Sequence, residues 1–377
     1  MQSHFIESLL MNIPVYKPTL GEKEKQYVMN CLDSSWISSK GEYISLFEKG
    51  FSNAIGVNHS ASVCNGTVAL HLALLALGIG AGDEVIVPTL TYIASVNAIK
   101  YTGAKPVFVD SLSDTWQMDP NDVKRKITSK TKAIMVVHLY GHPCDMDAIM
   151  AISKQFNLYV VEDCAEAFGS AYKEKRVGGI GHVSAFSFFG NKTITTGEGG
   201  MLCTNDPEIH KRAFHLKGQG LAPNRQYWHD VIGYNYRMTN ICAAIGLAQL
   251  ERAEEFIAKK QQIAKWYSEE LTGLPIEMQK DAPDISNTYW MVSILTPTQT
   301  QRDGLRKHLE INGVETRPLF FPIHEMPMYL SGSEAFPVAE DLSSRGINLP
   351  SYPELTLENI KFIASKIRGY LLEFKGG

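Results

Sequence analysis

The sequence predicts an α/β fold in two parts: a large domain built on a mostly parallel sheet, and a smaller C-terminal α/β domain. Two observations carry this prediction. Short apolar runs alternate with helical patterns from about residue 55 to residue 250, and one long charged helix then leads into a shorter mixed segment. The length of 377 residues agrees, because it is enough for two or three domains.

The strand-like runs are apolar throughout, which is typical of strands buried on both faces of a sheet. They cover residues 84–87, 106–110, 133–138, 158–163, 183–188 and 201–204. Helical patterns at residues 67–77 and 146–156 lie between some of these runs. Alternating strands and helices imply a mostly parallel sheet with helices on both sides.

The second domain is predicted from the change of pattern near residue 250. A long charged helix over residues 251–271 is followed by a strand near 289–295 and by helices near 302–312 and 357–374. We therefore expect a large domain over residues 1–250 and a small domain over 251–377, and we leave open that the N-terminal segment packs on the small domain.

Charge and cysteine usage exclude several classes of protein. Lys plus Arg is 36 and Asp plus Glu is 40, a net charge of −4, so no basic excess exists for general nucleic-acid binding. The short basic run at residues 124–132 is interpreted as a solvated helix end. The six cysteines form no C-x-x-C pair, which indicates reduced, mostly buried thiols in a cytoplasmic protein. The N-terminus has no signal-peptide pattern, and no apolar run is long enough to span a membrane.

The first candidate for chemistry is Lys192, in the segment SAFSFFGNKTITTGEGGM. It follows a buried strand and has apolar neighbours, so desolvation can lower the pKa of its amine. Such an amine can act as a Schiff-base nucleophile toward an aldehyde. The alternative is an ordinary loop lysine with its ammonium group in water.

The second candidate is Asp163, at the C-terminal end of the apolar run in LYVVEDCAEAFGS. Ligands of open α/β sheets bind at this edge, and a buried carboxylate there needs a cationic partner such as a protonated pyridine nitrogen. Glu166 follows one turn later if a helix begins here. The alternative is that Asp163 is only a helix N-cap.

The third candidate is an anion site where Asn65, Gly66 and Thr67 open an apolar helix. Free backbone N–H groups and the helix dipole favour a phosphate there, and Ser187 could add a hydroxyl donor. Simple capping is the alternative. The nearby glycines at 78, 80 and 82 do not form a dinucleotide fingerprint, because Asp83 stands where the third glycine is required.

Three further groups carry weaker signals. Tyr92 could stack on a planar ring, although an aromatic residue at such a position is commonly part of the core. The segment GYNYRMTN at residues 233–240 is rich in amide and guanidinium groups, and a loop or a subunit interface explains it equally well. The donor atoms of residues 138–145 have no recognised ligand spacing, so we expect no metal site.

Taken together, the order and spacing of these segments resemble the sugar aminotransferases of the DegT/DnrJ/EryC1/StrS family, within the fold-type I pyridoxal phosphate (PLP) enzymes. The resemblance extends from IPVYKP near residue 13 to GINLPSYPELT near residue 346. It is carried by WISSKGEYISLFE, HLYGHPCDMD, FSFFGNKTITTGEGGM and GYNYRMTNICAAIGLAQLER.

The resemblance implies a role for each candidate. Lys192 matches the Schiff-base lysine, and Asp163 matches the carboxylate that pairs with the pyridine nitrogen. The remaining cofactor contacts would be Gly66, Thr67 and Ser187 at the phosphate, Tyr92 on the ring, and Asn235 reaching the phosphate of the neighbouring subunit in a homodimer. Glu166 stands where many members carry Gln, near the 3-hydroxyl group of the cofactor, and this departure leaves its role less certain.

The implied reaction is transamination, in which the cofactor passes through its aminated form, pyridoxamine phosphate (PMP). L-glutamate would be the donor, and a GDP-linked 4-keto-6-deoxy-mannose on the way to O-antigen would be the acceptor. A UDP- or dTDP-linked keto sugar is the alternative acceptor. A dehydratase is the alternative activity, but that branch of the family carries His where this chain has Lys192. A non-catalytic binding protein is a third hypothesis.

The nucleotide contacts are the least determined. Guanidinium groups suit a pyrophosphate, but each candidate could equally form a surface ion pair or an interdomain contact. The candidates are Trp36, Ser38, Arg225, Arg237, Arg317 and His324.

Overall fold

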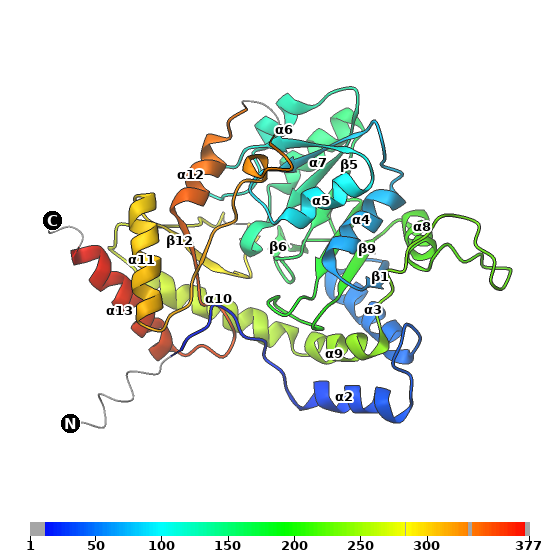
Figure 1. The fold of residues 1–377 in the computed structure, drawn as a ribbon, viewed down its shortest axis with the longest axis horizontal. Coiled ribbons are helices and arrows are strands. Elements are labelled where there is room, and N and C mark those ends of the chain that lie inside the picture. Colours follow the sequence, from blue (N-terminus) through cyan, green and yellow to red (C-terminus); the bar gives the residue numbers. More distant parts are fainter. Residues whose placement is uncertain (1–11, 283, 331–333, 374–377) are drawn as a thin grey trace.

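A computed structural model describes residues 12–282, 284–330 and 334–373 (Figure 1). Two sequence-based expectations lie outside the described residues. One is the absence of a signal peptide over residues 1–11, and the other is Phe374, the expected last residue of the final helix.

A seven-stranded sheet forms the centre of the large domain. Its order is β1-β9-β8-β5-β4-β2-β3. The strands are β1 (His59–Val63), β2 (Glu84–Pro88), β3 (Lys105–Val109), β4 (Thr131–Val137), β5 (Tyr159–Asp163), β8 (Val183–Ser187) and β9 (Gly200–Thr204). Only β9 runs antiparallel to its neighbours. The predicted mostly parallel sheet is therefore confirmed, and the carboxyl ends of six strands meet at one edge.

Helices cover both faces of this sheet, as the unalternating apolar runs predict (Figure 1). Val85 and Val87 face the core under α4 (Gly66–Ala76), α5 (Ile93–Tyr101) and α8 (Pro207–Lys217). Ile86, between them, faces the opposite core, under α6 (Pro120–Lys126) and α7 (Met146–Phe156). Three more helices complete the domain: α2 (Glu22–Asp33), α3 (Glu42–Ile55) and α9 (Asn240–Leu250).

A smaller four-stranded sheet lies in the C-terminal part of the chain. Its order is β10 (Glu277–Met278), β12 (Val292–Leu295), β14 (Gly346–Leu349) and β13 (Arg317–Pro318). The helices around it are α11 (Gln299–Ile311), α12 (Pro337–Arg345) and α13 (Leu357–Glu373). A third sheet joins the two parts, because β11 (Ile285–Ser286) pairs with β6 (Ala171–Tyr172), which pairs with β7 (Lys175–Arg176). The short 3₁₀ helices η1 (Leu139–Gly141) and η2 (Ile323–Glu325) lie in loops.

Helix α10 (Ala253–Glu270) connects the two cores (Figure 1). Phe256 near its start belongs to the core around α3 and α9, whereas Tyr267 near its end belongs to the core of the small sheet. The N-terminal segment meets this second core, since Ile13 pairs with Val314. The domain boundary at residue 250 stays a prediction.

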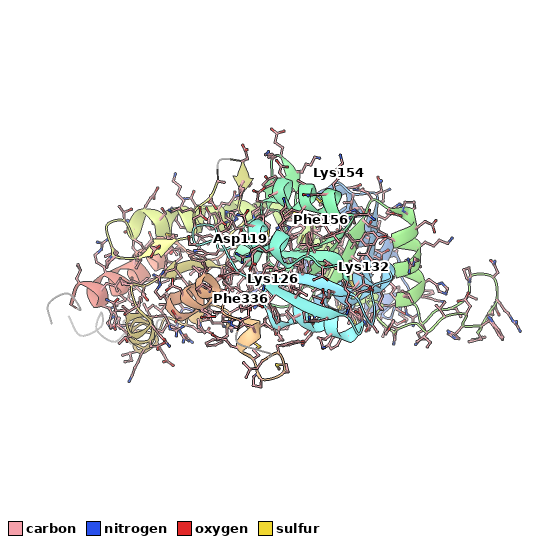
Figure 2. All side chains as sticks on the ribbon, turned by 90° about the horizontal axis from the view of Figure 1, so that it is seen from above. Asp119, Lys126, Lys132, Lys154, Phe156 and Phe336 are labelled. Atoms are coloured by element: carbon pink, nitrogen blue, oxygen red, sulfur yellow. The ribbon has the colours of Figure 1, made fainter. Side chains whose placement is uncertain are left out.

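The basic run at the end of α6 takes part in a contact between distant segments. Lys126 forms an ion pair with Glu334 and lies 5.2 Å from the ring centre of Phe336, beside α12 (Figure 2). Arg125 bonds Asp122 on its own helix at 2.6 Å. The run is therefore only partly a solvated helix end.

Two further expectations concern thiols and membranes. All six cysteines are free, and four of them are buried. Among the helices of the described residues, none combines the length and the hydropathy that a membrane crossing requires.

A cluster of phenylalanines fixes α3 against the sheet. The ring of Phe51 lies 4.9 Å from that of Phe186, 5.3 Å from Phe188 and 5.4 Å from Phe168. Phe186 lies in β8 and Phe188 directly follows this strand, before the loop that carries Lys192. Packing of α3 thus supports the position of that loop.

We expect Phe51→Ala to lower the free energy of unfolding by about 3–5 kcal/mol, because it removes a fully buried ring and leaves a cavity. Urea unfolding followed by circular dichroism measures this loss. Phe156→Ala is the control, since Phe156 is 38% exposed at the end of α7 and should cost much less. Equal losses in the two variants would contradict the prediction.

Candidate functional site

The candidate site lies at the carboxyl edge of the large sheet. Asp163 ends β5, and Ser187 ends the neighbouring strand β8. The chain then turns and brings Lys192 back toward this edge, with the Lys192 N–H donating to the Phe189 carbonyl at 2.9 Å. Asp163, Ser187 and Lys192 therefore lie at the same edge of the sheet, as expected for ligand sites of parallel sheets.

Asp163 is buried, and two donors hold its carboxylate. The Ser95 hydroxyl donates to Oδ2 at 2.7 Å, and the Ala165 N–H donates to Oδ1 at 3.0 Å. Burial raises the pKa of Asp163, while these donors oppose the rise. No helix begins after Asp163, so the alternative of a helix N-cap is wrong. The carboxylate is fixed in position and can accept a further cationic donor.

Lys192 is an enclosed amine, and the alternative of a loop lysine in water is wrong. Its side chain is 13% exposed, and its Nζ lies 3.9 Å from Oε1 of Glu166. The same Nζ lies 3.8 Å from the ring centre of Trp290. Burial lowers the pKa of Lys192, and the carboxylates of Glu166 and Asp163 act against this effect. A lysine in such surroundings is easily deprotonated and becomes nucleophilic.

Glu166 completes the charged group. No helix begins at this point of the chain; a turn carries Glu166 instead. Its Oε2 accepts the Tyr140 N–H at 2.8 Å, and burial raises its pKa to about 7. Tyr140 adopts a left-handed backbone conformation with φ of 58°, which is unfavourable for a bulky residue and typical of functional sites.

The N-terminus of α4 lies directly beside the end of β8. The Asn65 side chain caps this helix by accepting the Val68 N–H at 3.0 Å, so capping does occur there. A Cβ atom on Gly66 would lie 2.7 Å from the Cβ of Ser187, so glycine permits the close approach. Thr67 follows in the first turn of α4, and the backbone N–H groups at a helix N-terminus favour an anion.

These residues fit the cofactor that the sequence suggests. Two buried carboxylates, Asp163 and Glu166, stand against the single amine of Lys192, so the group lacks one positive charge. A protonated pyridine nitrogen would supply that charge. The helix terminus at Gly66 and Thr67, with Ser187, offers N–H and O–H donors of the kind that a phosphate needs.

Tyr92 and Asn235 are more exposed than the central group. Tyr92 is 57% exposed before α5, so the alternative of a core residue is wrong, and its ring lies 5.6 Å from that of Phe320. Asn235 is exposed on the segment between α8 and α9, where it pairs with Gly218 directly after α8. The segment as a whole extends away from the body of the molecule (Figure 1). The side-chain oxygen of Asn235 accepts from Arg237 at 3.3 Å. In the part of the chain that the structure describes, no hydrogen bond or ion pair joins Asn235 or Arg237 to Lys192.

The other nucleotide candidates are dispersed over the surface. Trp36 is 57% exposed, and its carbonyl accepts from the Asn240 side chain at 2.7 Å. Ser38 is exposed in the same loop, and its carbonyl accepts the Asn240 N–H at 2.6 Å. Arg225 lies 4.0 Å from the ring centre of Trp228 on the extended segment. None of these three candidates contacts the charged group within this chain.

Arg317 and His324 have local partners. Arg317 pairs with Glu315 at 3.5 Å on the surface. His324 bonds the hydroxyl of Thr89 at 2.7 Å and lies 3.3 Å from Glu340, so it connects the end of β2 to α12. Arg317 thus forms a surface ion pair, and His324 forms a contact between distant segments. These are the two alternatives to nucleotide binding that the sequence left open.

Three residues that contact the site were missed by the sequence reasoning. Ser95 lies in the segment PTLTYIASVN, where a hydroxyl one turn after Tyr92 could have been noticed. Trp290 and Tyr16 carry no such signal, because they are almost 100 and 180 residues away from Lys192 in the chain. The Tyr16 hydroxyl donates to the Lys192 carbonyl, and the Trp290 indole donates to the Asn191 carbonyl at 2.7 Å.

A second buried pair lies behind Asp163. His138 Nε2 donates to Glu162 Oε2 at 3.1 Å, since the Cys144 N–H points at Nδ1 and fixes the neutral tautomer. Three backbone N–H groups, at residues 178, 180 and 181, also donate to Glu162. His138, Glu162 and Cys164 could geometrically hold a metal ion, but these hydrogen bonds already satisfy the Glu162 carboxylate.

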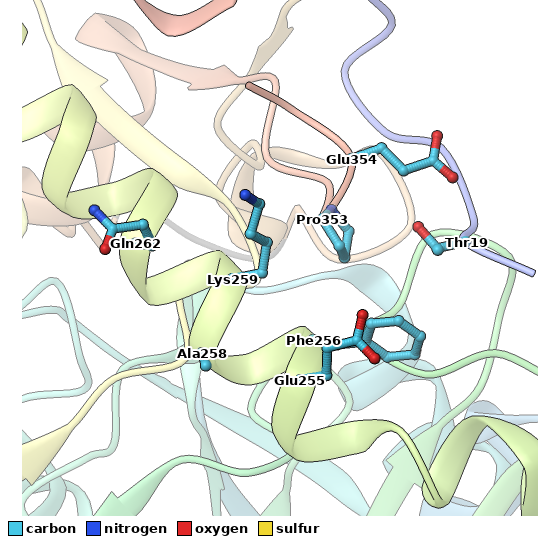
Figure 3. Close-up of a pocket in the computed structure, with 8 residues that line it drawn as sticks. All are labelled: Thr19, Glu255, Phe256, Ala258, Lys259, Gln262, Pro353 and Glu354. Atoms are coloured by element: carbon cyan, nitrogen blue, oxygen red, sulfur yellow. The ribbon is translucent and has the colours of Figure 1, made fainter. Parts of the chain in front are cut away.

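One surface cavity lies away from the charged group. It has a volume of about 470 Å³ and lies between α10 and the segment at Pro353, with Thr19, Lys259 and Glu354 among its lining residues (Figure 3). No candidate site residue lines it.

The raised pKa of Glu166 predicts a pH-dependent stability. Between about pH 4.5 and 7 the folded chain holds a proton on Glu166 that the unfolded chain has released. The contribution of protonated Glu166 to folding stability therefore falls over this range and is lost as the pH rises through 7. Glu166→Gln removes the loss. The difference in stability, variant minus unsubstituted protein, should therefore be larger at pH 8 than at pH 5 by about 2 kcal/mol in favour of the variant.

Urea unfolding of the cofactor-free protein at both pH values measures this difference. Glu255→Gln is the control, because its side chain is 67% exposed. A Glu166→Gln effect that is the same at both pH values would show that Glu166 does not titrate abnormally.

Comparison with known proteins places the fold and the site in one family. Residues 18–368 match the model of the DegT/DnrJ/EryC1/StrS aminotransferase family. A GDP-perosamine synthase of Escherichia coli O157:H7 is 62% identical over 358 residues, covering 95% of this chain and 98% of that protein. A GDP-perosamine synthase of Vibrio cholerae is 50% identical over 362 residues, covering 95% and 99%.

Solved structures agree. The crystal structure of the aminotransferase TlmJ from Streptoalloteichus hindustanus matches with a TM-score of 0.92 and 30% identity, covering 96% of this chain and all of that one. Matching structures also include PLP and PMP forms. The chain therefore belongs to the DegT/DnrJ/EryC1/StrS family of PLP-dependent sugar aminotransferases.

Proposed function

We propose that the protein transfers an amino group from L-glutamate to GDP-4-keto-6-deoxy-D-mannose and so forms GDP-perosamine, a precursor of O-antigen. The relatives at 62% and 50% identity, both GDP-perosamine synthases, support the choice of sugar. The observation that carries the chemistry is the enclosed amine of Lys192 beside two buried carboxylates. Neither a UDP- or dTDP-linked sugar nor the dehydratase alternative is favoured, since the relatives at 62% and 50% identity are GDP-perosamine synthases and the chain has Lys at position 192.

The catalytic roles follow from charge and position. PLP, when bound, withdraws electrons from the carbon atom that is deprotonated. Lys192 would hold the aldehyde carbon of the cofactor through its amine, and the same amine would serve as the general base and acid. Asp163 keeps the pyridine nitrogen protonated, because its own carboxylate is held by Ser95 and the Ala165 N–H. Glu166, whose Oε1 lies 3.9 Å from the Lys192 amine, is assigned to the 3-hydroxyl group.

The remaining assignments follow the same proposal. The N-terminus of α4, with Gly66, Thr67 and Ser187, binds the phosphate of the cofactor. Tyr92 covers the ring. We assign the large domain to residues 1–250 and the small domain to 251–377. The six free thiols favour the reducing cytoplasm.

We also propose a homodimer with shared active sites. Asn235 is exposed at the base of the segment between α8 and α9, and this segment extends away from the body of the molecule (Figure 1). The same segment exposes several large apolar side chains, which a partner would cover. They are Leu221, Tyr227, Trp228, Val231 and Ile232. Asn235 would donate to the cofactor phosphate in the site of the neighbouring subunit. The candidates for nucleotide contacts remain Trp36, Ser38, Arg225, Arg237, Arg317 and His324.

The first test is the absorption spectrum of the purified protein with PLP. We expect a visible band that L-glutamate bleaches and that GDP-4-keto-6-deoxy-mannose restores. Lys192→Ala should keep its far-ultraviolet circular dichroism and lose both the band and turnover, because no other amine stands at this position. Lys173→Ala, at an exposed lysine, is the control. Normal transamination by Lys192→Ala would refute the assignment, and a band that is insensitive to glutamate would refute the donor.

The shared site predicts complementation between two inactive variants. Lys192→Ala and Asn235→Ala should each have little activity alone. A mixed dimer would contain one site with Lys192 from one subunit and Asn235 from the other, so activity should return when the two are refolded together. Activity is measured by release of GDP-perosamine against each variant refolded by itself. No gain on mixing would place Asn235 in the site of its own subunit or outside any site.

A further inference from the structure

Lys260 is a buried lysine that the proposed reaction does not use. It lies on α10, and only 1% of it is exposed. Its Nζ donates to the carbonyl of Trp290 at 3.1 Å and to the carbonyl of Ser351 at 2.5 Å, and it lies 5.3 Å from the ring centre of Tyr16. Among the residues that the structure describes, no carboxylate forms an ion pair with this amine, and burial lowers its pKa to about 7.

A lysine is energetically unfavourable at this buried position. Burying an amine without an opposite charge costs several kcal/mol, whereas methionine would fill nearly the same volume at no such cost. The packing of α10 therefore does not explain Lys260. Its hydrogen bonds do set the position of two carbonyl groups, those of Trp290 and Ser351, which belong to segments 61 residues apart in the chain.

Two of the residues that Lys260 contacts also contact Lys192. The Trp290 ring faces the Lys192 amine at 3.8 Å, and its indole N–H holds the Asn191 carbonyl. The Tyr16 hydroxyl donates to the Lys192 carbonyl, and burial raises the pKa of Tyr16, so this hydroxyl stays protonated. Lys260 is thus connected to Lys192 through two residues, Trp290 and Tyr16, each of which contacts both lysines.

We propose that Lys260 is a positioning residue for Lys192: it holds Trp290, on which the Lys192 amine lies, and Tyr16, which fixes the Lys192 backbone. Lys260 does not touch the reacting atoms. It keeps the amine of Lys192 enclosed and aimed toward the carboxyl edge of the sheet. This inference rests on the proposed role of Lys192.

The test is Lys260→Met, measured by the pKa of Lys192 in the full-length protein without cofactor. Trace acetylation with acetic anhydride from about pH 6 to 11, followed by mass spectrometry of the Lys192 peptide, gives this pKa. Without Lys260, Trp290 and Tyr16 lose their fixed position and water reaches the amine. Because burial is the main cause of the low pKa of Lys192, we expect an upward shift of about 0.5 pH unit or more.

The control is Lys265→Met, at an exposed lysine of the same helix. It should leave the labelling profile of Lys192 unchanged. A Lys260→Met protein with a lower melting temperature but an unchanged Lys192 pKa would overturn the proposal, because Lys260 would then act only on stability. An equal shift in both variants would also overturn it.

If Lys260→Met does not fold, Lys260→Gln decides the question. Its shorter amide can reach only one of the two carbonyls and carries no charge, so an upward shift is still expected. An unchanged profile in folded Lys260→Gln would overturn the proposal. The measurement needs no bound PLP, so its failure is distinct from failure of the proposed function, which shows as a missing visible band.

Discussion

The candidate site depends on a charge imbalance that the fold keeps out of water. Asp163 and Glu166 are both buried, and the amine of Lys192 lies 3.9 Å from Oε1 of Glu166. Burial makes charge costly for these groups: it raises the pKa of Glu166 and lowers the pKa of Lys192, while the two carboxylates act to raise the Lys192 pKa. With both carboxylates ionised, the group lacks one positive charge. The missing charge is what a protonated pyridine ring would bring. The cofactor therefore completes the electrostatics of the folded chain as well as its chemistry.

The surrounding structure makes this imbalance tolerable. Asp163 is held by the Ser95 hydroxyl, and Glu166 by the amide of Tyr140, whose left-handed backbone directs the N–H toward it. Behind them, Glu162 accepts from His138 and from three backbone N–H groups. Consecutive carboxylates at the end of β5 thus serve opposite purposes. Glu162 uses its hydrogen bonds to connect loops within the protein, whereas Asp163 can still accept a hydrogen bond from a ligand.

Segments outside the large sheet also contact the loop that carries Lys192. Trp290 comes from the segment before β12, and Tyr16 comes from the N-terminal segment that packs beside it. Both reach Lys192, and Lys260 on α10 lies behind both. Because α10 belongs to both cores, the helix that connects the domains also carries the residue that we assign to positioning the amine. Domain packing and the environment of Lys192 are therefore linked.

The sequence by itself determined the α/β class, the strands β2 to β5, β8 and β9 to within two residues, and the local chemistry of Lys192 and Asp163. Apolar runs and strand ends are local signals, because burial on both faces leaves the same composition wherever a strand stands in the sheet. The resemblance supplied the roles. Only the tertiary structure decided that α3, Ser95, Trp290, Tyr16 and Lys260 support this site. Such contacts join segments up to 244 residues apart, and no periodicity in the chain records which distant segments will meet.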